Sequence, residues 1–169
     1  MALLEIKKYP NPILREKCQE VKEVTPEIRN IIEGMKKIVE KDQSVAGLAA
    51  PQIGISKRII VVETERGAEG FINPKIFKKT KETEIDWEGC LSLPGIFVKI
   101  KRWAGVEIEA LNEKGEKIQF RVTGFLARVF QDEIDHLNGI LIIDHVSKLE
   151  RFKLRDKLKE LEKNYGFSR

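Results

Sequence analysis

The chain has little cysteine and little histidine: two of each among 169 residues. Two cysteines, Cys18 and Cys90, are too few to hold a domain of this size together by disulfides, so each thiol is expected to be core packing or chemistry. No stretch approaches the roughly 18 consecutive apolar residues of a membrane span, and the first residues lack the apolar core and cleavage site of a secretory signal. We therefore expect a cytoplasmic protein with no membrane partner.

A strong net charge is also missing. Lys and Arg number 31 and Asp and Glu number 27, with 41% hydrophobic residues, so the signature of disorder is absent and one folded domain over 1–169 is expected. The charge is uneven, because residues 148–169 contain eight basic and four acidic residues whereas the rest contains 23 of each. An acidic partner would therefore be met through the C-terminal segment.

Local patterns predict an α+β fold in which small antiparallel or mixed sheets pack around a central buried helix. Thr25 is expected to cap an N-terminal helix that starts at Pro26. Short runs at 58–62, 106–110 and 118–122 have the composition or alternation of strands.

The segment 125–137 is apolar on most sides, which predicts the buried helix, and a further apolar run follows at 140–143. Ser147 and Glu150 form a capping box that predicts a C-terminal helix. The inward stripe of that helix is expected to contain Leu154, Leu158, Leu161 and Tyr165.

The second half of the buried helix carries titratable side chains, which are Asp132, Glu133, Asp135 and His136. Buried charges need partners. Asp132 and His136 are spaced i and i+4 on one face, where they could hold a metal ion with Glu133 beside them as a base. The alternative is that these residues form a solvated end of the helix.

Cys90 lies in a stretch punctuated by glycine and proline, 87–95, where a thiol can face a cleft. With a carboxylate and an imidazole it would complete three protein ligands and leave a fourth position open, which is typical of a catalytic metal site. The alternative for Cys90 is a small buried hydrophobe, which is our interpretation of Cys18.

Three motifs occur in order along the chain: VAGLAAPQ at 45–52, EGCLS at 88–92 and DEIDH at 132–136. Together they closely resemble the motifs of the peptide deformylases, metalloenzymes that remove the formyl group from the N-terminal formyl-methionine of new polypeptides. The resemblance covers essentially the whole chain and implies formyl-methionyl nascent peptides as substrates.

The resemblance also implies a role for each residue of the site. The implied metal ligands are Cys90, Asp132 and His136. The implied catalytic groups are the base Glu133 and two oxyanion donors, the Gln52 side chain and the Leu91 main-chain N–H. The implied peptide-binding residues are Val45, Ala46, Gly47, Glu88, Gly89 and Val129. The implied cofactor is one divalent ion, usually Fe²⁺ in the family, with Zn²⁺ or Ni²⁺ as alternatives.

Two positions depart from the family pattern. Val45 replaces a glycine, which adds bulk beside the peptide and excludes a positive φ. Asp132 replaces the first metal-binding histidine, and its shorter side chain is expected to need a shifted helix or a bridging water to reach the ion. A second anionic ligand also neutralises a divalent ion and raises the pKa of the bound water, which predicts lower turnover.

Two function classes therefore remain. The first is a working deformylase with a Cys90, Asp132 and His136 site, which the retention of Glu133 and Gln52 favours. The second is a deformylase-fold protein that binds formyl-peptides or ribosomes with weak or no chemistry. A purely structural zinc site is disfavoured by the open ligand position and the adjacent base.

Two features lie outside these motifs. His145 could be a replacement ligand, but a polar strand end is the preferred interpretation, because nothing in its spacing directs it back to the helix. The basic segment 148–169 is either a solvated amphipathic face or, as in some family members, a contact for ribosomal RNA. We expect no DNA partner.

Overall fold

The computed structural model describes residues 4–166 and confirms the α+β fold. A five-stranded antiparallel sheet has the order β1-β2-β3-β6-β7, and β4 and β5 form a separate two-stranded sheet. The strands are β1 (Gly47–Ala49), β2 (Ile59–Thr64), β3 (Gly67–Lys79), β4 (Thr83–Gly89), β5 (Phe97–Trp103), β6 (Gly105–Leu111) and β7 (Lys117–Thr123). The helices are α1 (Pro26–Lys41), α2 (Gly124–Leu137), α3 (Lys148–Lys153) and α4 (Arg155–Tyr165), and the 3₁₀ turns are η1 (Pro12–Arg15), η2 (Ala50–Ile53) and η3 (Ile142–Asp144).

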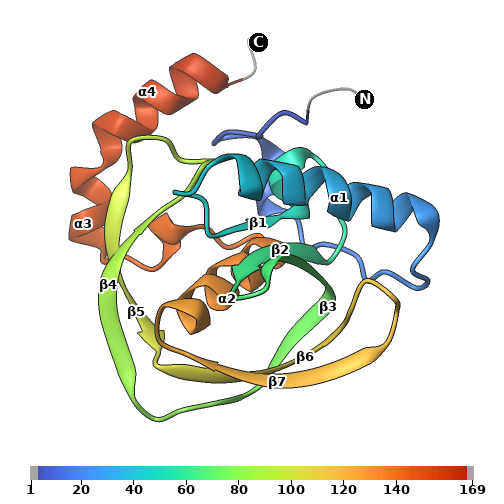
Figure 1. Cartoon of the computed structure of the whole chain (residues 1–169). Coiled ribbons are helices and arrows are strands. Elements are labelled where there is room, and N and C mark those ends of the chain that lie inside the picture. Colours follow the sequence, from blue (N-terminus) through green and yellow to red (C-terminus); the bar gives the residue numbers. More distant parts are fainter. Residues whose placement is uncertain (1–3, 167–169) are drawn as a thin grey trace.

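Strands β1 and β2 lie between α1 and α2 (Figure 1). Strand β2 is therefore covered on both faces: Ile60 and Val62 belong to the core cluster of α2, whereas Ile59 and Val61 belong to that of α1. A strand buried on both faces has a continuous apolar run rather than an alternating pattern. The predicted buried strand at 58–62 is confirmed.

Helix α1 begins as predicted. The Thr25 hydroxyl accepts a hydrogen bond from Ile28 N–H at 3.3 Å. Pro26 starts the first turn, where a backbone N–H would have no acceptor within the helix, so the lack of an N–H in proline costs no hydrogen bond. Its buried residues are Ile28, Ile32, Met35 and Val39. This stripe supports β1 and β2 from one side.

Helix α2 is the central buried helix. Nine of its 14 residues are buried, which confirms the prediction for 125–137. Phe130 of α2 packs against Phe71 of β3 and Phe120 of β7, with ring centroids 5.0 and 5.3 Å away. These contacts fix the position of α2 against the larger sheet.

Two antiparallel hairpins complete the framework. Strands β6 and β7 pair at the predicted positions, and the turn between them contains Gly115 at φ 84°, a conformation that glycine adopts without strain. Strands β4 and β5 pair from Thr83↔Trp103 to Gly89↔Phe97. The loop that joins them, 90–96, carries Cys90.

The segment after α2 differs from the prediction. The apolar run folds into η3 rather than a strand, so His145 is not a strand end. The Asp144 carboxylate accepts a hydrogen bond from Leu141 N–H at 2.9 Å, and this local side-chain bond closes a turn in place of a strand.

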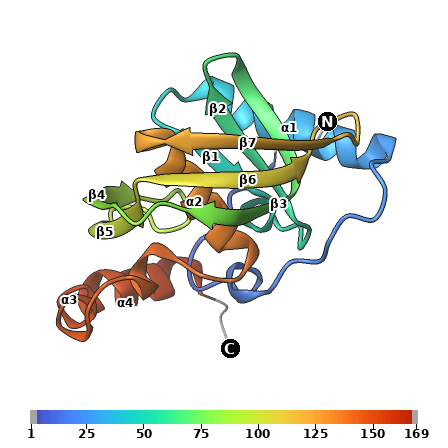
Figure 2. The same ribbon diagram turned by 90° about the horizontal axis from the view of Figure 1, so that it is seen from below.

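The C-terminal helix is divided in two. Ser147 caps α3 as predicted, accepting a hydrogen bond from Glu150 N–H at 3.2 Å. The chain then breaks at Leu154, and α4 continues in a new direction (Figure 2). The break lets Leu158 and Leu161 reach a core cluster with the β4–β5 loop, whereas Tyr165 is 46% exposed and was wrongly placed in the buried stripe.

Within residues 4–166, every helix is too short or too polar to cross a membrane.

Candidate active site

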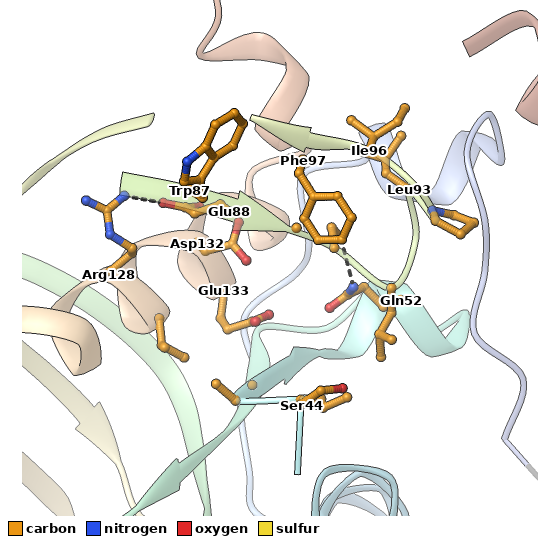
Figure 3. Close-up of a pocket in the computed structure, with 18 of the residues that line it drawn as sticks. Ser44, Gln52, Trp87, Glu88, Leu93, Ile96, Phe97, Arg128, Asp132 and Glu133 are labelled. Carbon is orange, nitrogen blue, oxygen red and sulfur yellow. Dashed lines mark hydrogen bonds and ion pairs between the residues drawn. The ribbon is translucent and has the colours of Figure 1, made fainter. Parts of the chain in front are cut away.

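A cleft of about 590 Å³ opens between β1, the β4–β5 loop and α2 (Figure 3). It is lined by all the residues predicted for the site except His136, which lies behind them and is 1% exposed. The predicted residues in its walls are Val45, Ala46, Gly47, Gln52, Glu88, Gly89, Cys90, Leu91, Val129, Asp132 and Glu133. Three segments that are distant in the sequence therefore meet at one cavity.

Gly47 allows β1 to approach α2 closely. A Cβ at this position would lie 2.9 Å from Cγ and Oε1 of Glu133 and from Cγ1 of Val129. Any larger residue would push the Glu133 side chain away from its present place. Val45, two residues earlier, is 8% exposed and has no positive φ, so its backbone is unstrained.

Gln52 is held with its amide nitrogen toward the cleft. Its Oε1 accepts a hydrogen bond from Ala49 N–H at 2.9 Å, and its Nε2 lies 3.3 Å from Ser92 Oγ and 3.5 Å from Cys90 Sγ. Gly54, at φ 85°, ends the turn that presents it. Because the bond to Ala49 holds the amide in this orientation, its N–H group is suited to stabilise negative charge that develops in the cleft.

Cys90 starts the loop after β4, and its thiol lies between two polar groups. Its Sγ is 3.5 Å from Gln52 Nε2 and 3.5 Å from His136 Nε2. At the preceding residue, Gly89, a Cβ would lie 2.7 Å from the ring of Phe97. The Phe97 ring therefore lies against the Gly89 backbone at the side of the cleft, and Leu91 also lines the cleft.

One turn of α2 supplies three neighbouring donors. Ligand atoms of Asp132, Glu133 and His136 lie within 4.8 Å of one another. Glu133 is 4% exposed and His136 1%, so the interpretation of these residues as a solvated helix end is wrong. Cys90 joins the group at His136.

Burial shifts the pKa values of these groups. Burial, reinforced by the charge of Glu88, raises the pKa of Asp132 to about 7. Burial and the Asp132 carboxylate raise the pKa of Glu133 well above its usual range. Burial lowers the pKa of His136 to about 4, so its imidazole is neutral at pH 7, as metal ligation requires. Burial also raises the pKa of the Cys90 thiol, which holds its proton until a cation replaces it.

Two buried arginines bind the acids behind the cleft. Arg102 donates to both oxygens of Glu88 at 2.9 Å and to Asp135 Oδ2 at 2.6 Å. Arg128 donates to Glu88 Oε2 at 2.7 Å. Arg102 Nη2 also lies 3.5 Å from Asp132 Oδ1, so Asp132 shares the guanidinium with two stronger partners.

Sequence reasoning missed both arginines, although each left a signal. Buried and exposed residues alternate along β5, and Arg102 occupies one of the buried positions, next to the exposed Lys101. Arg128 interrupts an otherwise apolar stretch of the buried helix. A buried arginine indicates a carboxylate partner, but the sequence does not say which one.

His145 is directed back toward α2, contrary to the expectation from its spacing. Its Nε2 lies 2.7 Å from Asp135 Oδ2 and 3.4 Å from Arg102 Nη1. His145 is the residue that ends the turn η3, and this turn brings its imidazole to Asp135 of α2. His145 therefore contacts the arginine network rather than the group of Asp132, Glu133 and His136.

The donors fit a divalent cation, and the carboxyl groups around them outnumber the guanidinium groups. The buried cluster has four carboxyl groups and two guanidinium groups, an excess of two acids. The carboxyl groups are those of Glu88, Asp132, Glu133 and Asp135, and the guanidinium groups are those of Arg102 and Arg128. Within residues 4–166, Glu133 Oε2 and His136 Nδ1 are buried without a hydrogen-bond partner. Cys90, Asp132 and His136 supply thiolate, carboxylate and imidazole, all of which ligate transition metals.

Comparison with known proteins gives one consistent result. Residues 3–152 match the family described as polypeptide deformylase. The peptide deformylase of Thermodesulfovibrio yellowstonii is 42% identical over 164 residues, which cover 94% of this chain and 98% of that protein. That of Halothermothrix orenii is 46% identical over 152 residues, covering 88% and 97%.

Solved structures agree with this result. A crystal structure of peptide deformylase from Plasmodium falciparum superposes with a TM-score of 0.88 at 38% identity, covering 95% of this chain and 96% of that one. The structure of the Thermotoga maritima enzyme superposes with a TM-score of 0.83 at 39% identity, covering 87% and 99%.

Proposed function

The chain belongs to the peptide deformylase family of metal-dependent hydrolases, and we propose that it removes the formyl group from the N-terminal formyl-methionine of new polypeptides. The observation that carries this proposal is the convergence of Glu133, the Gln52 amide and the Cys90 thiol on one cleft. A base, an oxyanion donor and a metal-ligating thiol are the parts that metal-assisted amide hydrolysis requires.

The substrate peptide would bind along β1. This strand is an edge of the five-stranded sheet, and residues 45–47 line the cleft. An extended peptide can add to such an edge through main-chain hydrogen bonds. Leu91 and Val129 give the cleft apolar walls suited to a methionine side chain, and Glu88 and Gly89 also line it.

The chemistry follows from three side chains and one main-chain group. Glu133 accepts a proton from the attacking water and later gives it to the departing nitrogen. The Gln52 amide and Leu91 N–H donate hydrogen bonds to the formyl oxygen as negative charge develops on it. The bond between the formyl carbon and the nitrogen breaks, and formate and a free amino terminus are released. The divalent ion, when bound, supplies the Lewis acidity that makes water nucleophilic at neutral pH.

Cys90, Asp132 and His136 would hold that ion. We propose Fe²⁺ as the resident metal, with Zn²⁺ and Ni²⁺ as ions that the same donors accept. Asp132 brings a second negative ligand and lies 3.5 Å from Arg102, which competes for its carboxylate. The second negative ligand weakens the activation of water and the competition from Arg102 weakens metal binding, so turnover is proposed to be lower than with histidine at this position.

The Arg102–Asp132 contact also favours a second candidate, a protein that binds formyl-peptides without efficient chemistry. Metal content of the purified protein and formate release from formyl-Met-Ala-Ser separate the two. About one equivalent of metal with steady formate release supports the enzyme. Peptide binding without formate release, in protein reloaded with Fe²⁺ under anaerobic conditions, supports the binding protein.

We further propose that helices α3 and α4 contact the ribosome. Residues 148–169 carry the whole net charge of the chain. Lys153, Lys157 and Lys159 are exposed. Contacts from such residues to phosphates would hold the enzyme near emerging formyl-peptides.

A further inference from the structure

Gln131 of α2 is a buried polar side chain that the proposed chemistry does not use. It is 4% exposed and directly precedes Asp132 and Glu133. Its Nε2 donates a hydrogen bond to the Trp103 carbonyl oxygen at 2.9 Å, and its Oε1 accepts one from Trp103 N–H at 3.1 Å. A third bond, from Nε2 to the carbonyl oxygen of Ala127 at 3.0 Å, ties the amide to its own helix. The Gln131 amide therefore pairs with the main chain of the last residue of β5.

The proposed metal site is assembled from two separate parts of the fold. Cys90 starts the loop that joins β4 to β5, whereas Asp132 and His136 lie on α2. Cys90 Sγ and His136 Nε2 are 3.5 Å apart. Two ligands of one tetrahedral ion, a thiolate at about 2.3 Å and an imidazole at about 2.1 Å, lie about 3.6 Å from each other. The position of α2 relative to the β4–β5 sheet therefore decides whether the thiolate and the imidazole can bind the same ion.

Within residues 4–166, two side chains of α2 form hydrogen bonds with the main chain of the β4–β5 sheet, those of Arg128 and Gln131. Arg128 donates to the carbonyl oxygens of Ile100 and Glu84, each at 2.9 Å. Arg128 also binds the carboxylate of Glu88 in the cleft wall (Figure 3). Gln131 is neutral and does not line the cleft. Replacing Gln131 therefore changes the contact between α2 and β5 without changing the charge or the wall of the cleft.

We propose that Gln131 is a positioning residue, whose amide fixes α2 on β5 and so holds Asp132 and His136 at the distance from Cys90 that one metal ion needs. A primary amide carries a donor and an acceptor side by side, which match the N–H and the carbonyl of one strand residue. The carboxylate of Asp132 reaches less far than the histidine of the family, so this site tolerates little movement of α2. This role rests on the proposed function, because it assumes that these residues bind a metal ion.

Titration of the metal-free protein with Co²⁺ tests this role, because a cobalt–thiolate bond gives a near-ultraviolet absorption band that reports Cys90 as a ligand. Gln131→Met keeps the length of the side chain and removes both bonds to Trp103. We expect the Co²⁺ affinity to fall about 10-fold or more, with a weaker thiolate band at saturation. After reloading with Fe²⁺ under anaerobic conditions, kcat for formyl-Met-Ala-Ser should fall about 10-fold or more. KM should stay within about twofold, because the cleft wall is unchanged.

Asn73 of β3 provides a matched control, because its amide pairs with the main chain of one residue in the same way. Its Oδ1 accepts a hydrogen bond from Val21 N–H and its Nδ2 donates one to the Val21 carbonyl oxygen, both at 2.8 Å. Asn73 has a φ of 51° and does not line the cleft. Glycine adopts this φ without strain, so Asn73→Gly removes the pair alone. This variant should lower the free energy of unfolding and leave the Co²⁺ affinity, the thiolate band and kcat unchanged.

A second variant covers the case in which Gln131→Met does not fold. Gln131→Ala leaves room for a water molecule at the main-chain groups of Trp103, and it should show the same losses. An unchanged affinity and thiolate band in a folded Gln131 variant, or equal losses in Asn73→Gly, would overturn the inference and leave the proposed function intact. A parent protein that binds Co²⁺ through Cys90 and releases no formate would contradict the proposed function, while loss of the band in the Gln131 variant would still support the positioning role.

Discussion

Replacing Gly47 by alanine tests whether the position of Glu133 controls catalysis. The new Cβ would lie 2.9 Å from Glu133 Cγ and Oε1 and from Val129 Cγ1. Ordinary contacts of these atoms are near 3.5–4.0 Å, so a shift of about 0.5–1 Å is needed. Because the neighbours are side-chain atoms, we expect Glu133 to move while the fold is kept.

A displacement of about 1 Å at a catalytic group lowers rates by up to about 100-fold. We therefore expect kcat for formyl-Met-Ala-Ser to fall between about 10-fold and 100-fold, with metal content unchanged because the proposed ligands do not move. Overpacking should lower the free energy of unfolding by about 1–3 kcal/mol. Formate release, metal analysis and thermal unfolding measure the three quantities.

Gly105→Ala is the matched control. Its new Cβ would lie 3.0 Å from Thr80 Cγ2, a similar crowding in the same sheet but away from the cleft. This variant should lose stability and keep its kcat. An unchanged kcat in Gly47→Ala, or equal loss of kcat in the two variants, would refute the reasoning.

Three other predictions follow from the structure. Asp132→His should raise metal occupancy and formate release at least 10-fold, about 1.4 kcal/mol in the barrier, and equal or lower activity would indicate a site built around the carboxylate. Burial raises the pKa of Asp144, but hydrogen bonds from Arg15 and Leu141 outweigh this effect and hold the pKa below 3.8. The ionised Asp144 carboxylate therefore stabilises the fold fully above pH 3.8, and this stabilisation is lost as the pH falls through the lowered pKa. Arg15→Met should therefore lower the free energy of unfolding at pH 7 by roughly 0.5–1 kcal/mol, and urea titrations should show this difference shrinking near pH 3; a pH-independent difference would contradict the assignment. Changing the exposed basic residues of the C-terminal helices to glutamine should weaken ribosome co-sedimentation and leave tripeptide turnover unchanged, whereas salt-independent binding would exclude a phosphate contact. The residues to change are Lys153, Arg155, Lys157 and Lys159, since Arg151 is bonded to the Ile143 carbonyl.

Much of the fold could be predicted from local signals. Thr25 and Pro26 mark the start of α1 by capping chemistry alone, and the continuous apolar run of β2 reflects its burial between two helices. The break at Leu154 could not be predicted, because no glycine or proline marks it. It arises from packing of α4 on the β4–β5 loop, a contact between distant segments.

The part of the site that lies on a single helix could be predicted, because residue spacing along a helix fixes which side chains are neighbours. Asp132 and His136 lie one helical turn apart, so their proximity follows from the sequence. Arg102 and His145 are different, because their partner Asp135 is 33 and 10 residues away, and only the folded chain shows the pairing.

The central claim is that Glu133 moves the proton in a deformylase cleft. Glu133→Gln keeps the size of the side chain and removes its basicity, and the measurement is formate release from formyl-Met-Ala-Ser alongside metal content. The account predicts that release falls by about 100-fold or more while about one equivalent of metal stays bound, because the proposed ligands are Cys90, Asp132 and His136. Undiminished release would contradict the assignment of Glu133 as the base, and loss of the metal together with activity would show that Glu133 is a ligand instead.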